Sequence, residues 1–160
     1  MCYFINVGLP QKAKQRWIEK LPRNLYASAG RYEKLSELRN DFSVVTITNG
    51  MCSCDLFNRK SDEDEFKKGK KKGWSENKIA RAIENSRKAA IQNNLNPDFR
   101  RWLSEVVEDA GEAYLLVHWD ADPLDLKSPI VLVVEAFRRA ETYIADEQLF
   151  HLKANHDNGV

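Results

Sequence analysis

Residues 44–57 read VVTITNGMCSCDLF, two strand-like runs separated by an Asn-Gly pair at positions 49–50. Asn-Gly between such runs is the strongest short-range hairpin signal, because both central residues of the tight turn need a positive φ. We therefore expect a β-hairpin in which Cys52 lies opposite Ile47. Side chains alternate between the two faces of a strand. Cys52 and Cys54 are therefore predicted to share the apolar face of the hairpin.

The segments on either side of this hairpin alternate between strand and helix patterns. Residues 58–73 contain an acidic run followed by a basic run, and we expect them to form a mobile surface loop. Residues 23–41 are ambiguous and could contain one short helix. The remaining periodicities predict strands at 2–7 and 113–119, and helices at 10–21, 75–92, 97–110 and 135–144. Residues 130–134 could form a strand or an extended segment, and residues 148–153 could form a last strand.

This order of elements predicts an α+β protein with a ferredoxin-like antiparallel sheet. The pattern is βαββαβ with one helix split in two, followed by a C-terminal extension. A chain of 160 residues is long enough for one domain with its own core. We place that single domain at residues 1–153 and expect residues 154–160 to be a frayed tail.

The charges of the chain are nearly balanced overall but are unevenly distributed. Hydrophobic residues are 42% and charged residues 31% of the chain, and the formal net charge is +1. Residues 1–80 hold 16 Lys/Arg against 10 Asp/Glu, whereas residues 81–160 hold 9 against 14. The balance does not favour nucleic acid, and no apolar run is long enough to span a membrane. We expect a cytoplasmic protein whose partner is another protein, and a homodimer stays open.

The three cysteines are the clearest candidates for a metal-binding or catalytic site. Cys52 and Cys54 would lie about 6.5–7 Å apart on one strand face, which is too far for a disulfide but suitable for one shared metal ion. Cys2 and His118 could complete a Cys₃His zinc site if their strands are neighbours. The alternatives are three small buried hydrophobic residues, or a catalytic Cys2 whose own α-amine acts as the general base.

Two further groups of residues are candidate binding residues. A basic run followed by an aromatic residue could neutralise phosphates and stack on a base, although the neighbouring acidic run would oppose this. An acidic loop after a strand could hold a divalent cation through oxygen ligands. The residues concerned are Lys67, Lys68, Lys70, Lys71, Lys72 and Trp74 for the first group, and Asp120 and Asp122 for the second.

The opening Met1-Cys2-Tyr3-Phe4, together with Gly50-Met51-Cys52-Ser53-Cys54, resembles a group of uncharacterised bacterial proteins. Those proteins begin MCxF and carry Gly-x-Cys-x-Cys near residue fifty. The resemblance covers about the first third of the chain. It implies no activity, but it favours the idea that the three thiols act together.

Two classes of function follow from these patterns. The chain has no Walker-type loop, no dinucleotide-binding Gly motif and no hydrolase or zincin motif. We therefore expect a small protein-interaction module of the immunity, antitoxin or regulatory accessory type rather than an enzyme. The alternative is a cysteine-cluster protein with a zinc-binding or thiol-reactive site at Cys2, Cys52 and Cys54.

Overall fold

Six strands form one mixed sheet in the order β2-β3-β1-β4-β6-β5. The computed structural model describes residues 3–29, 39–56, 62–93, 95–119, 128–141, 144 and 147–155. Neighbouring strands are antiparallel except β5 and β6, which are parallel. The strands are β1 (Tyr3–Pro10), β2 (Tyr26–Ala29), β3 (Phe42–Thr48), β4 (Glu112–Trp119), β5 (Ile130–Val133) and β6 (Leu149–Lys153). The α+β class is confirmed.

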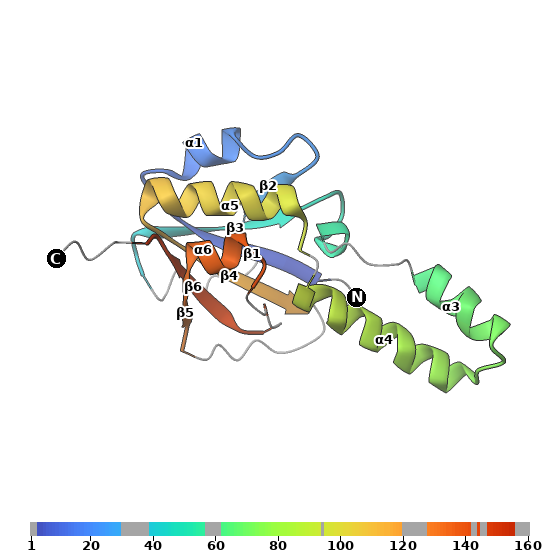
Figure 1. The fold of residues 1–160 in the computed structure, drawn as a ribbon. Helices are drawn as coiled ribbons and strands as arrows, with labels where there is room; N and C mark the ends of the chain where they lie inside the picture. The colour runs from blue at the N-terminus through green and yellow to red at the C-terminus, as the bar shows by residue number, and fades with distance from the viewer. Residues whose placement is uncertain are drawn as a thin grey trace.

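The helices fall into two groups with different places in the molecule. Helices α1, α5 and α6 lie over one face of the sheet, whereas α3 and α4 project away from it as a pair (Figure 1). The bounds are α1 (Lys14–Glu19), a short 3₁₀ turn at Cys54–Leu56, α3 (Asp62–Lys71), α4 (Glu76–Asn93), α5 (Pro97–Ala110) and α6 (Val134–Arg138). We call the projecting pair, residues 62–93, the arm, and the rest of the described chain the body.

The main core lies between the sheet and α5, and it follows from the alternation of side chains in β1. Alternate residues of β1 join the buried cluster that contains the apolar face of α5. The intervening residues of β1 point to the opposite face, where a smaller apolar cluster lies. The main cluster includes Tyr3, Ile5, Val7, Leu9, Phe99, Trp102, Leu103, Val106 and Val107, and the smaller one Phe42, Tyr114, Leu116 and Leu149.

The predicted boundaries of α5 are confirmed. The Asn96 side chain accepts hydrogen bonds from the backbone N–H groups of Asp98, at 2.8 Å, and Phe99, at 3.1 Å. These bonds satisfy donors that would otherwise have no partner at the helix start. Gly111 ends the helix with a φ of 86°, a conformation that favours glycine.

The ferredoxin-like topology as predicted is not matched. The prediction was a four-stranded antiparallel sheet with a separate C-terminal extension. In the structure the last two strands belong to the same sheet, because β6 pairs with β4 and β5 pairs with β6. The sheet therefore has six strands and includes one parallel pair.

The predicted hairpin at residues 44–57 is wrong: the chain turns at Gly50, but Asn49 lacks the positive φ that the predicted turn requires. Gly50 has a φ of 105°, and the Asn49 N–H donates to the Cys52 carbonyl. The returning segment cannot pair with β3, because β3 already pairs with β1 on one side and β2 on the other. Strand β2, which we did not predict, occupies the second edge of β3. Residues 54–56 form a 3₁₀ turn instead of a strand.

The mobile loop predicted at residues 58–73 is wrong for its described part, which forms α3. Four acidic residues occupy the first turn of α3 and three lysines its last turn. This order of charges stabilises a helix, because the helix macrodipole favours anions at the N-terminus and cations at the C-terminus. Glu63 and Lys67 also form an i,i+4 ion pair at 2.7 Å. The charge runs that suggested a solvated loop are therefore features of a helix.

Packing within the arm depends on Gly69 of α3. Gly69 is buried, and a Cβ atom placed on it would lie 2.5 Å from Cγ1 of Ile79, a buried residue of α4. The absence of a side chain at Gly69 therefore allows the two helices to approach closely.

We predict that Gly69→Ala destabilises the arm. Alanine favours a helix over glycine by about 1 kcal/mol, but forcing a methyl group into a packed contact costs about 1–3 kcal/mol. Trypsin should therefore cleave the lysines of the arm faster in the variant than in the wild type. In an Ile79→Ala background, Gly69→Ala should raise the cleavage rate by less than it does in the wild type, because the atoms that clash are absent. Slower cleavage of Gly69→Ala than of the wild type would contradict this account.

Candidate functional site

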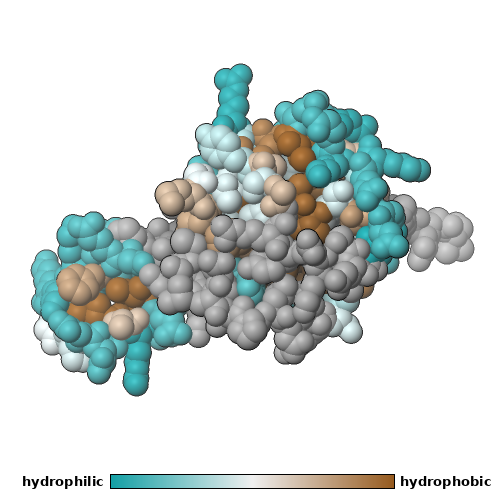
Figure 2. Space-filling model, turned by 180° about the vertical axis from the view of Figure 1, so that it is seen from behind, coloured by the Kyte–Doolittle hydropathy of each residue, from teal (hydrophilic) through white to brown (hydrophobic). Residues whose placement is uncertain are grey.

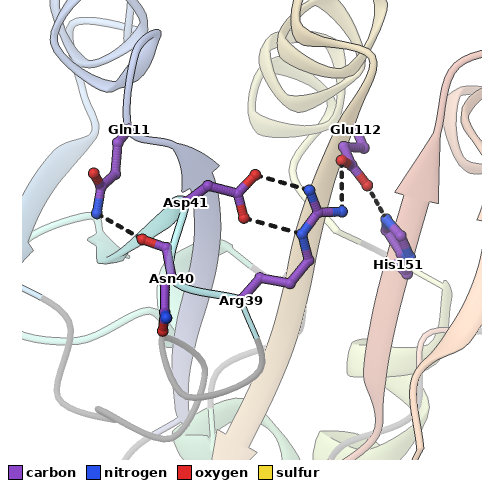
Figure 3. Close-up of polar contacts among 6 residues, drawn as sticks. All are labelled: Gln11, Arg39, Asn40, Asp41, Glu112 and His151. Atoms are coloured by element: carbon purple, nitrogen blue, oxygen red, sulfur yellow. Dashed lines mark hydrogen bonds and ion pairs between the residues drawn. The ribbon is translucent and has the colours of Figure 1, made fainter.

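A cluster of charged side chains joins three segments at one end of the sheet (Figure 3). Arg39, just before β3, donates to Asp41 through Nε at 3.0 Å and Nη2 at 2.8 Å. Its Nη1 donates to Oε1 of Glu112, the first residue of β4, at 2.8 Å. The other Glu112 oxygen lies 2.5 Å from Nε2 of His151 in β6. One arginine and one glutamate therefore connect β3, β4 and β6.

Aromatic contacts complete a closed series of side-chain contacts around this cluster. The Arg39 guanidinium lies 4.9 Å from the centre of the Phe42 ring. Phe42 packs edge-on against Tyr114 at 5.0 Å, and Tyr114 stacks on His151 at 4.4 Å. Glu112 then links His151 back to Arg39. This closed series of side-chain contacts passes over β1, which lies between β3 and β4.

Gly8 of β1 leaves space for the aromatic ring of Tyr114. Gly8 lies opposite Tyr114 on one side and Val44 on the other. A Cβ atom on Gly8 would lie 3.1 Å from the Cβ of Tyr114 and 3.4 Å from a ring carbon. The position therefore favours a residue without a side chain, so that the Tyr114 ring can lie over the central strand.

The ionisation of the cluster follows from these contacts. Hydrogen bonds from the Arg39 guanidinium hold the pKa of the Asp41 carboxyl below its ordinary value of 3.8. The same bonds raise the pKa of Arg39. Burial raises the pKa of the Tyr114 hydroxyl, so this group stays neutral at physiological pH.

An open cleft of about 340 Å³ lies beside the cluster and is lined by Arg39, Ala110, Gly111, Glu112 and Lys153. Three donor positions of Arg39 are already bonded to carboxylates. The guanidinium therefore serves to hold the end of the sheet together more than to present a free charge to a ligand.

The predicted thiol site is only partly covered by the described residues. Cys52 and Cys54 are both half-buried and form no disulfide. The backbone N–H of Tyr3 donates to the Cys54 sulfur at 3.4 Å, so this thiol lies at the start of β1. Cys54 packs against the main core. Cys2 lies outside the described residues.

A serine between the two cysteines fixes this segment to the sheet. The buried Ser53 hydroxyl accepts a hydrogen bond from the Ile5 N–H at 2.8 Å and donates to the Ile47 carbonyl at 2.5 Å. The Ser53 N–H also donates to the Tyr3 carbonyl at 3.0 Å. The chain after β3 is therefore held by side-chain and backbone bonds in place of the predicted strand ladder.

The remaining predicted ligand of a zinc ion, His118, is buried in β4 opposite Phe4. Among the described residues, no group of three or more His, Cys, Asp or Glu side chains could hold a metal ion. Because the predicted Cys₃His set includes Cys2, the zinc site stays a prediction. Asp120 and Asp122, the predicted cation ligands, also lie outside the described residues.

The predicted basic run lies on α3 and in the turn that follows it. Lys67 and Lys68 pair with acidic residues of α3, and Lys70 lies 3.4 Å from Glu76 of α4. Lys71 and Lys72 form no ion pair within the described part of the chain. The C-terminal end of α3 and the turn that follows it form the end of the arm that lies farthest from the body (Figure 1).

Trp74 lies in the turn of the arm between two lysines. The ammonium nitrogens of Lys72 and Lys78 lie 5.1 Å and 4.8 Å from the centre of a Trp74 ring. Each contact is a cation–π interaction, worth about 0.5–1 kcal/mol at an exposed site. These contacts hold two positive charges beside one half-buried aromatic ring at the tip of the arm.

Sequence reasoning missed the cluster of Arg39, Glu112 and His151. The three residues are separated by up to 112 positions, and they meet only because β4 pairs with β6 and lies beside β1. Alternation along β4 and β6 could have placed Tyr114 and His151 on particular faces of their strands. It could not have shown which strands are neighbours.

Comparison of the chain with known protein families, curated proteins and solved structures found no match. Among the described residues, no helix is both long enough and apolar enough to cross a membrane. The function must therefore be argued from the geometry itself.

We predict that Asp41→Asn lowers stability at neutral pH and has less effect in acid. Because the folded state lowers the pKa of Asp41, its contribution is present above the unfolded value and is lost as pH falls through the lowered pKa. The melting temperatures of wild type and variant should therefore converge on acidification. Glu141→Gln, an exposed carboxylate outside the cluster, provides the control. A difference in melting temperature that is constant with pH would contradict the ion-pair explanation.

Proposed function

We propose that this chain is a protein-interaction module and that the arm is the element that contacts its partner. The observation that carries this proposal is the projection of α3 and α4 from the body (Figure 1). Within the described residues, the two helices pack mainly against each other. Among the residues whose side chains the structure describes, the main cluster of the body contains residues of the sheet, α1, α5, α6, the 3₁₀ turn and connecting loops, and none of the arm.

The charges of the arm support an acidic partner. Residues 67–81 contain seven Lys/Arg and one Asp/Glu, whereas residues 62–65 are all acidic. The acidic residues lie in the first turn of α3, and the basic ones continue to the turn between the helices. A concentrated positive tip attracts negative surfaces and increases the rate of encounter with them.

Apolar side chains beside these charges favour a protein over a nucleic acid. Phe66 of α3 is 44% exposed, and Ile83 of α4 is half-buried. Figure 2 shows apolar side chains on the arm, at the left of the view, bordered by hydrophilic ones. An exposed apolar area with a polar rim is typical of protein–protein contact sites. The acidic residues at the base of the arm and the net charge of +1 also oppose binding along a phosphate backbone.

These features define the class of partner: a protein with an acidic surface that also offers apolar contacts. An immunity, antitoxin or regulatory accessory role suits a chain of this size with no catalytic motif. Such proteins act by occupying or shielding a surface of another protein, for which a projecting charged arm is well suited.

We predict that Lys71→Glu with Lys72→Glu weakens binding to the partner by about tenfold or more, because attraction at the tip becomes repulsion. The matched control is Lys12→Glu with Arg23→Glu, which produces the same net charge on exposed residues of the body. The wild type, the arm variant and the control are immobilised in parallel and exposed to cell extract with and without nuclease treatment. Retained proteins are then identified and eluted with salt.

The expected result is an acidic protein that the wild type and the control retain and the arm variant loses. Raising the salt to about 1 M should release it, because charges are then screened over about 3 Å. Two results would contradict the proposal. The first is equal retention by all three proteins. The second is a partner that disappears after nuclease treatment, which would indicate nucleic acid.

A further inference from the structure

Strand β5 ends the sheet and exposes an apolar edge. It pairs with β6 on one side and with no other strand among the described residues. Its four residues are Ile130, Val131, Leu132 and Val133, and none of them is charged. Three of the side chains are strongly exposed, at 47% for Ile130, 58% for Val131 and 46% for Val133. The strand therefore presents both apolar side chains and backbone hydrogen-bonding groups at its outer edge.

Natural proteins normally protect edge strands of this kind against pairing with a strand of another chain. Natural sheets block their edge strands with charged side chains, proline or bulges, because an open edge is a template for another strand. Strand β5 contains no charged residue and no proline, although Pro129 comes directly before it. The other edge strand, β2, contains serine and two alanines and exposes one large hydrophobic side chain, Tyr26. The two edges of the sheet therefore differ, and β5 is the more apolar.

We propose that β5 pairs with β5 of a second copy of this chain, antiparallel and about a two-fold axis. The uncharged strand argues for a second copy as the occupant. Two β5 strands that face each other bring no like charges together, and a two-fold contact uses the same patch on both chains and closes after two copies. A charged segment of another protein would find no complementary charge on β5 itself.

The alternation of side chains selects a register for this contact. Val131 and Val133 lie opposite His151 and Lys153 of β6, so the two valines share one face of the sheet. With Leu132 on the two-fold axis, Val131 lies opposite Val133 of the second copy, and Val133 lies opposite its Val131. Each chain then covers the two exposed valines of the other, and valine pairs of this kind stabilise strand pairing.

The contact is short, and this determines the strength that we expect. The strand has four residues, so the contact is small and belongs with weak, transient interfaces. We therefore expect a dissociation constant of about 0.1–1 mM. A dimer formed in this way presents two arms, so that weak binding by each arm can be strengthened when both bind one assembly.

Sedimentation equilibrium of the purified chain tests this proposal directly. From about 10 μM to about 1 mM, the average mass of the wild type should rise from 18.5 kDa toward twice that value and no further. V131K/V133K should remain a monomer, because it places like charges opposite each other. V131K/V133E should dimerise, because the same register then places a lysine opposite a glutamate in each pair.

The controls separate loss of dimerisation from loss of folding. Circular dichroism and melting temperature should be close to the wild-type values in both variants, because the replaced side chains are largely exposed. Ser28→Lys on the opposite edge, β2, should dimerise like the wild type.

Four results would overturn the proposal. They are a wild-type mass that stays at 18.5 kDa, dimerisation by V131K/V133K, a monomeric V131K/V133E, and a mass that continues to rise beyond two copies. The last result would indicate β5 pairing with β2 of the next chain, which does not close.

Discussion

The pairing of β1 with two other strands is the constraint on which the body depends. It is antiparallel to β3 on one side and to β4 on the other. One set of its residues enters the main core with α5, and the other set lies on the opposite face. Gly8 belongs to the second set, and its lack of a side chain leaves room for Tyr114. The contacts of Arg39, Phe42 and His151 all build on the position of that ring.

The arm and the body are stabilised by different interactions. Helix α3 is stabilised by charges placed along its own axis, and it approaches α4 closely at Gly69. Since the helix dipole acts within the first and last turns, this stabilisation is local and modest. The body instead depends on a buried core with residues from many elements. The stable element and the element available to a partner are thus separated, as in other proteins whose binding segments have low local stability.

Local signals predicted much of the secondary structure, and pairing between distant segments limited the rest. The cap at Asn96 and the end at Gly111 depend on neighbouring residues, so the sequence shows them directly. The expected hairpin failed because β2 takes the edge of β3 that the returning strand needed. No local signal reveals such competition. The same holds for the cluster of Arg39, Glu112 and His151, whose members come together only through sheet order.

Hydrogen exchange measured residue by residue tests the division into body and arm most directly. The backbone N–H groups of β1 lie in the middle of the sheet, so they should exchange only when the whole body unfolds. Those of α3 and α4 should exchange much faster, through local opening of the arm that leaves β1 protected. If the amides of α3 and α4 exchange as slowly as those of β1, the arm is an integral part of the core and the account is contradicted.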